Sequence, residues 1–156
     1  MYSIKLDDKK MNSVMEIFLE ATPDAGKQFY QNFKGKGEIV MLNLLKFKEI
    51  ADYTNLEHLR PEQEISGEEA YQLYLHTTKP QFQKAGSKIV YYGKGRDFLI
   101  GPETEKWDAV LLVKHQSVLK FMEFAQSEDY LKNAGHRKAA LKDSRLLPTT
   151  EMKDQL

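Results

Sequence analysis

The sequence predicts one α+β domain with the element order β-α-β-β-α-β, preceded by two short helices. A length of 156 residues is close to the commonest size of a single domain. Residues 38–48 form an apolar segment typical of a buried strand. After a well-marked helix start at Ser66, two strand-like segments follow at 88–96 and 107–115.

The first 37 residues are predicted to form a helical extension, and residues 38–156 the main domain. Apolar side chains from Met11 to Leu19 are spaced for one face of a helix. Thr22 and Pro23 then start a second helix, because threonine is a good N-cap and proline fits the first helical position.

The first strand of the main domain, residues 38–48, carries two polar side chains. It is apolar on both sides, which predicts cover on both faces. Asn43 must be hydrogen-bonded there, because burying an unpaired amide costs about 1–3 kcal/mol. It is predicted either to donate to a ligand carbonyl inside a barrel or to bond a neighbouring loop. Lys46 projects from the other side and is predicted to reach solvent or to pair with Asp143.

The second helix-forming region follows a long loop, residues 49–65. Ser66 and Glu69 form a capping-box pattern, Pro80 should kink the helix, and Gly86 should end it. Tyr74 lies on this helix and is predicted either to pack in the core or to present its hydroxyl to a ligand.

The remaining elements complete the predicted order. Ser117 caps a helix to about residue 125, Ser127 caps another to about residue 141, and a strand covers 144–150. Trp107 begins the preceding strand on the same predicted face as His115, where it either lines a pocket or joins the core.

This order is the ferredoxin-like arrangement. Four strands with helices on one face leave the other face uncovered, and an apolar bare face must be buried. Pairing with a second copy would bury it, so the sequence predicts a homodimer that closes a barrel.

Composition excludes several classes of protein. The 23 basic residues balance the 23 acidic ones, so a nucleic-acid partner is not predicted. Cysteine is absent, which excludes disulfides, thiolate metal sites and a cysteine nucleophile. No two of the four histidines are spaced for a helical metal site. No secretory signal or membrane span is predicted, so we expect a cytoplasmic location.

Several segments resemble a known family. They are VMLNLLKF (40–47), ISGEEAYQLY (65–74), LIGPETEKWDAVLLVKH (99–115) and HRKAALKDSRLLP (136–148). They resemble an uncharacterised family, a domain of unknown function, within the dimeric α/β-barrel superfamily. The resemblance covers about residues 38–150 and implies a ferredoxin-like protomer and a sheet-to-sheet dimer. It implies no particular reaction.

The last of these segments contains three further candidate residues. His136 has a side chain suited to proton transfer near neutral pH. Arg137 and Arg145 could anchor a carboxylate, or could instead join a structural ion-pair network with Asp108 and Asp143.

These observations predict an enzyme or binder that holds a carbonyl- or carboxylate-bearing small molecule without a bound cofactor. In this hypothesis Asn43 polarises the ligand, His136 moves a proton, Arg145 anchors an anion, and Trp107 and Tyr74 line the pocket. One alternative is a non-catalytic dimeric interaction or stress-response module whose barrel is filled by side chains. A third is a haem-handling barrel.

Overall fold

The structure, a computed structural model, describes residues 16–153 and contains one four-stranded antiparallel sheet. The strands have the spatial order β2-β3-β1-β4, which is the ferredoxin-like order and confirms the predicted fold class. They are β1 (Ile39–Phe47), β2 (Lys88–Lys94), β3 (Ala109–His115) and β4 (Leu141–Thr149).

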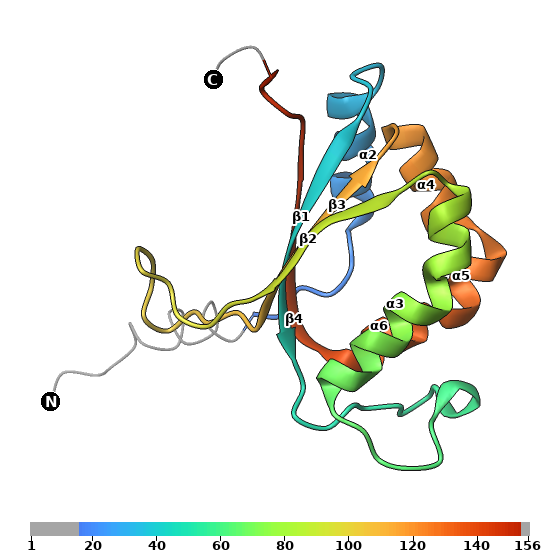
Figure 1. The fold of residues 1–156 in the computed structure, drawn as a ribbon, viewed down its shortest axis with the longest axis vertical. Helices are drawn as coiled ribbons and strands as arrows, with labels where there is room; N and C mark the ends of the chain where they lie inside the picture. Colours follow the sequence, from blue (N-terminus) through green and yellow to red (C-terminus); the bar gives the residue numbers. More distant parts are fainter. Residues whose placement is uncertain (1–15, 154–156) are drawn as a thin grey trace, which may run out of the picture.

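The helices cover one face of this sheet (Figure 1). They are α2 (Pro23–Phe33), the short 3-10 helix η1 (Glu57–Leu59), α3 (Gly67–Lys84), α4 (Val118–Gln126), α5 (Glu128–Asn133) and α6 (Gly135–Ala140). No helix within residues 16–153 combines the length and the apolar character needed to cross a membrane.

The predicted helix starts are correct. Thr22, Ser117 and Ser127 each accept a hydrogen bond from a backbone N–H in the first turn, and Ser66 forms the full capping box. The helix predicted from Ser127 to about residue 141 is in fact two helices, α5 and α6. The helix predicted from Met11 to Leu19 lies mainly outside the described residues, and residues 16–19 are not helical.

The two faces of the sheet differ in their cover. Ile39, Met41 and Leu45 of β1 point towards the helices and are fully or almost fully buried. Val40, Leu42 and Leu44 point the other way and are only partly buried. A single protomer thus covers β1 on one face only, and the predicted cover of the other face depends on a second copy. We call this second side the open face.

Trp107 lies on the open face, so the prediction that it shares a face of the sheet with His115 is wrong. Its ring is stacked with Lys46 and Arg145, at 5.2 and 5.0 Å from the ring centroid. The regular alternation of side chains between the two faces of the sheet does not extend back to Trp107, because β3 begins only after Asp108. There the backbone N–H of Asp108 donates to the Leu45 carbonyl, and its carboxylate accepts from the Phe47 N–H.

Candidate ligand-binding site

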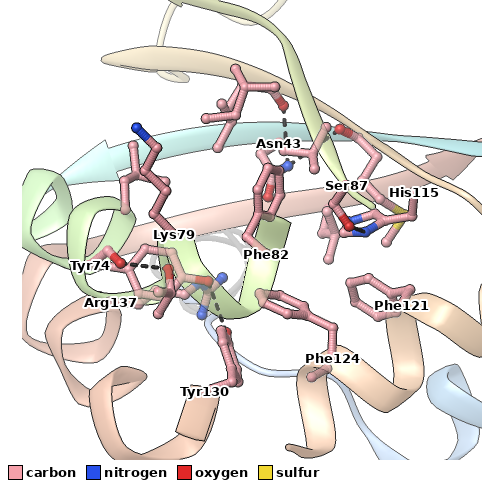
Figure 2. A pocket seen from close by; sticks show the side chains of 18 of the residues that line it. Asn43, Tyr74, Lys79, Phe82, Ser87, His115, Phe121, Phe124, Tyr130 and Arg137 are labelled. Carbon is pink, nitrogen blue, oxygen red and sulfur yellow. Dashed lines mark hydrogen bonds between the residues drawn. The ribbon is translucent and has the colours of Figure 1, made fainter. Parts of the chain in front are cut away.

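A cavity of about 1010 Å³ lies between the helix-covered face of the sheet and helices α3, α4 and α5. This volume is in the range of pockets that hold small molecules. Strands β1 and β3 form its floor (Figure 2). Apolar and aromatic side chains make up most of its wall: Met41, Leu75, Phe82, Leu111, Val113, Phe121 and Phe124.

Asn43 stands on the floor of this cavity, at the centre of β1. Its Nδ2 donates to the carbonyl oxygen of Leu111 at 3.1 Å and more weakly to that of Met41 at 3.4 Å. Its Oδ1 makes no hydrogen bond with any residue in 16–153. Asn43 therefore offers a ligand an acceptor, not the predicted donor, and offers it on the helix-covered face, not inside a barrel.

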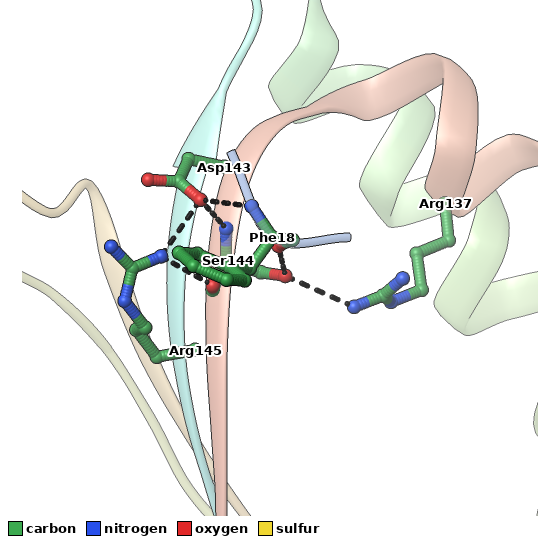
Figure 3. A network of polar contacts seen from close by, with 5 residues as sticks. All are labelled: Phe18, Arg137, Asp143, Ser144 and Arg145. Carbon is green, nitrogen blue, oxygen red and sulfur yellow. Dashed lines mark hydrogen bonds and ion pairs between the residues drawn. The ribbon is translucent and has the colours of Figure 1, made fainter. Parts of the chain in front are cut away.

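Arg137, on α6, supplies a cation to the cavity wall. Its Nη1 donates to the Leu19 carbonyl oxygen at 2.6 Å, and its Nη2 donates to Ser144 Oγ at 3.3 Å (Figure 3). No carboxylate among residues 16–153 lies within ion-pair distance of it. A guanidinium has five N–H donors, so this partly buried cation keeps donors for a ligand.

Two tyrosines form a second polar group near Arg137. The hydroxyl groups of Tyr74 and Tyr130 are 2.8 Å apart. Burial, reinforced by Tyr130, raises the pKa of Tyr74 well above its ordinary value. The phenol therefore stays protonated and acts as a hydrogen-bonding group. The sequence predicted that Tyr74 either packs in the core or presents its hydroxyl to a ligand, and in the structure it lies in the cavity wall.

Ser87 and His115 form a third polar group, away from Arg137. Ser87 Oγ lies 2.7 Å from His115 Nδ1, and both side chains are buried. The rings of Phe82, Phe121 and Phe124 surround the imidazole with centroid distances of 4.9 to 6.2 Å. Burial lowers the pKa of His115 to about 4, so its ring is neutral at neutral pH.

His115 was not among the predicted site residues, although a signal for it existed. Strand alternation correctly placed it on the same face as Leu111 and Val113. A polar side chain on an apolar strand face is the pattern that singled out Asn43, and it applies equally here.

The chain is similar to RPA0582, a protein of unknown function from Rhodopseudomonas palustris. The two share 33% identity, the match covers 88% of this chain and 99% of that one, and the TM-score is 0.77. The chain belongs to the RPA0582 family. The methylated form of RPA0582 gives 32% identity, coverage of 91% and 100%, and a TM-score of 0.79.

The RPA0582 family agrees with the predicted resemblance to an uncharacterised family. No protein-family model matches this chain, and no curated protein matches it. A dimeric ferredoxin-like protein of unknown function from Thermobifida fusca is similar at a lower level. It shows 13% identity, a TM-score of 0.44, and coverage of 76% of this chain and 94% of that one.

In this member of the RPA0582 family, His136 lies outside the cavity. Its Nδ1 is 2.7 Å from the Tyr53 hydroxyl, so it ties α6 to the loop at residues 49–65. Burial lowers the pKa of His136, and the nearby His58 lowers it further. The structure therefore gives His136 a role in packing. The hypothesis of proton transfer requires His136 to lie beside Asn43, and the structure does not place it there.

Three other predicted site residues, Lys46, Trp107 and Arg145, lie on the open face. Arg145 forms an ion pair with Asp143 at 2.8 Å and lies over the ring of Phe18 at 4.8 Å (Figure 3). The pair of Asp143 and Arg145 is one part of the predicted ion-pair network. The rest of that network does not form within residues 16–153, where Asp108 accepts from the Phe47 N–H and Arg137 binds no carboxylate. Within residues 16–153 no group of three or more His, Asp or Glu side chains is placed to hold a metal ion.

Proposed function

We propose that this protein binds a small molecule bearing a carboxylate or carbonyl group in the cavity between its sheet and its helices. The observation that carries the proposal is the cavity itself, with about 1010 Å³ of space inside one protomer. Such a volume favours a small-molecule site over an interaction module filled by side chains. An apolar wall with a few convergent polar groups is the usual composition of a ligand pocket.

The polar groups of the cavity suit an anionic or hydrogen-bonding ligand without a bound cofactor. Arg137 offers N–H donors to a carboxylate, and charge-assisted bonds of this kind are strong in a partly dry site. Asn43 Oδ1 accepts from a ligand N–H or O–H group. Among residues 16–153, two imidazoles line the cavity, those of His76 and His115. His76 is exposed, so in a reaction on a buried ligand the available imidazole is that of His115, in its neutral form.

The test uses small carboxylates, each paired with its neutral primary amide. Amide-resolved NMR of the isotope-labelled protein locates each compound by the backbone signals that it shifts. We expect both members of a pair to shift signals of residues that line the cavity, with the carboxylate bound more tightly. Arg137→Gln should remove the preference for the carboxylate.

Lys138→Gln is the matched control, because Lys138 is an exposed cation next to Arg137 on α6 and is not among the residues that line the cavity. This variant should keep the preference. If the compounds shift only signals outside the cavity, or if both variants behave as the wild type does, the proposal is wrong.

We also propose that the protein is a homodimer whose two open faces pack together. The open face carries apolar side chains from all four strands, among them Val40, Leu42, Leu44, Tyr91, Val110, Leu112 and Leu147. Apolar surface of this extent favours a protein partner, and a second copy presents the same complementary sheet.

Sedimentation velocity tests the dimer. Leu147 is 57% exposed on the open face, so Leu147→Glu should leave the protomer folded and yield monomers. Leu99 is 99% exposed in the loop between β2 and β3, and Leu99→Glu serves as the control that stays dimeric. A monomeric wild type would contradict the proposal.

A further inference from the structure

We propose that the ligand is an elongated monocarboxylate, with its carboxylate at Arg137 and its apolar body lying along β1 and β3 towards His115. This inference rests on the proposed function and specifies the class of ligand. Three features of the cavity support it, namely its length, the apolar character of its middle and the different chemistry of its two ends.

The strand register gives the length. Arg137 donates to Ser144, which pairs with Leu45 of β1, whereas His115 pairs with Ile39 of the same strand. Positions 45 and 39 are six residues apart (45 − 39 = 6), or about 20 Å at about 3.4 Å per residue. Figure 2 shows Arg137 and Tyr74 at one side of the cavity and Ser87 and His115 at the other.

Between these ends the cavity is apolar. Met41 and Val113 lie side by side on its floor, and Leu75 and Phe82 line it from α3. Strands β1 and β3 contribute no charged side chain to it, and Asn43 is the polar residue of its floor between the two ends. On α3, Thr78 already donates its hydroxyl to the Tyr74 carbonyl oxygen, and the polar side chains of Gln72, His76 and Gln83 are exposed. A ligand of matching length therefore needs an apolar body. It can also carry one hydroxyl or N–H group that donates to Asn43 Oδ1.

The carboxylate belongs at Arg137 because of how the cations are placed. Lys79 and Lys88 also line the cavity, but both are exposed, where water solvates their ammonium groups. Arg137 is partly buried and held in place by Leu19 and Ser144. Glu20, the acidic residue of the wall, is exposed. A partly desolvated guanidinium without a carboxylate gains most from an anionic ligand.

The far end accepts no second charge. There His115 is buried within an aromatic cage, and its Nδ1 is already bonded to Ser87. A carboxylate beside His115 would lose its water, and the cation next to Ser87, Lys88, is exposed and solvated, so the loss of water is poorly compensated. The site should therefore discriminate against a dicarboxylate of the same length.

The test is isothermal titration calorimetry with unbranched saturated monocarboxylates of increasing chain length, below their micelle concentrations. Each buried methylene should tighten binding about fourfold, until the extended chain reaches about 20 Å. Dicarboxylates of equal length should bind at least about tenfold more weakly. Arg137→Gln should weaken binding of the monocarboxylates by about tenfold or more, and Lys138→Gln, which changes a cation outside the cavity, by less than about twofold.

The outcomes separate this inference from the proposed function. If short carboxylates shift the cavity signals but affinity does not rise with chain length, or dicarboxylates bind equally well, the elongated ligand is wrong and the proposed function stands. If neither short nor long carboxylates shift these signals, both are wrong.

A second measurement on the wild-type protein tests the orientation of the ligand without a variant. A monocarboxylate with a nitroxide at the far end of its chain should broaden the backbone signals of Ser87 and His115. The same acid with its nitroxide beside the carboxylate should broaden that of Ser144. The reverse pattern, or broadening confined to open-face residues such as Leu112, would overturn the proposal.

Discussion

Replacing His115 by phenylalanine should remove a large part of the pH dependence of stability. The wild-type imidazole is buried and has a pKa of about 4, against 6.5 for an unhindered histidine. Above pH 6.5 the ring is neutral in both the folded and the unfolded protein, so it adds no pH dependence. As the pH falls from 6.5 to about 4, the unfolded state takes up a proton that the folded state does not bind, and stability is lost.

The size of this effect follows from the two pKa values. At about 1.4 kcal/mol for each pKa unit, the loss attributable to His115 is about 3 kcal/mol across that interval. His115→Phe should fit among the surrounding aromatic rings, at a pH-independent cost of about 1–3 kcal/mol for the unpaired Ser87 hydroxyl. His136 titrates in both proteins, so the difference between the two stability curves isolates His115.

Urea unfolding, followed by the fluorescence of the single tryptophan, measures the free energy of unfolding at each pH. Ser87→Ala is the companion variant, because it removes the hydrogen bond but leaves the imidazole buried. It should keep the wild-type pH dependence. A difference between wild type and His115→Phe that stays constant from pH 6.5 to 4 would show that the imidazole is not held neutral by burial.

Two further predictions concern a pair of glycines and the amide on the cavity floor. Gly67→Ala should destabilise the protein by more than about 2 kcal/mol, because a Cβ at this position would meet the backbone carbonyls of Lys48 and Ala140. Gly26 lies on α2 with open space around it, so Gly26→Ala should stabilise the protein by up to about 1 kcal/mol. Urea unfolding checks both, and equal effects would contradict the packing at α3. Asn43→Leu should lower the free energy of unfolding by on the order of 1 kcal/mol, so the melting temperature should change by only a few degrees. The same variant should weaken binding of amide fragments more than binding of carboxylates. NMR titration of the paired fragments measures this, and equal losses for both classes would rule out Oδ1 as the acceptor.

The fold could be predicted from the sequence because its signals are local. Ser66, Ser117 and Ser127 satisfy backbone N–H groups within their own first turns, so their role does not depend on distant residues. The short, nearly continuous apolar run of β1 likewise predicts a strand, whatever covers it.

The site could be predicted only in part, because it depends on contacts between distant segments. Asn43, Tyr74 and Arg137 were predicted as site residues and line the cavity. Trp107 was assigned to the wrong face, because hydrogen bonds of Asp108 to β1 interrupt the alternation. His136 was predicted as a site residue because its imidazole suits proton transfer, but its hydrogen bond to the Tyr53 hydroxyl is a contact between distant segments that no local pattern shows.

The segment that precedes α2 has a consequence for ligand binding. Phe18 is fixed to β4 by hydrogen bonds with Asp143 and Ser144 (Figure 3). The residues after it, Leu19, Glu20 and Ala21, line the cavity. Docking of this segment and occupancy of the cavity are therefore linked equilibria. Any ligand that contacts the docked segment must protect it against proteolysis, by the same factor by which docking increases the affinity for that ligand.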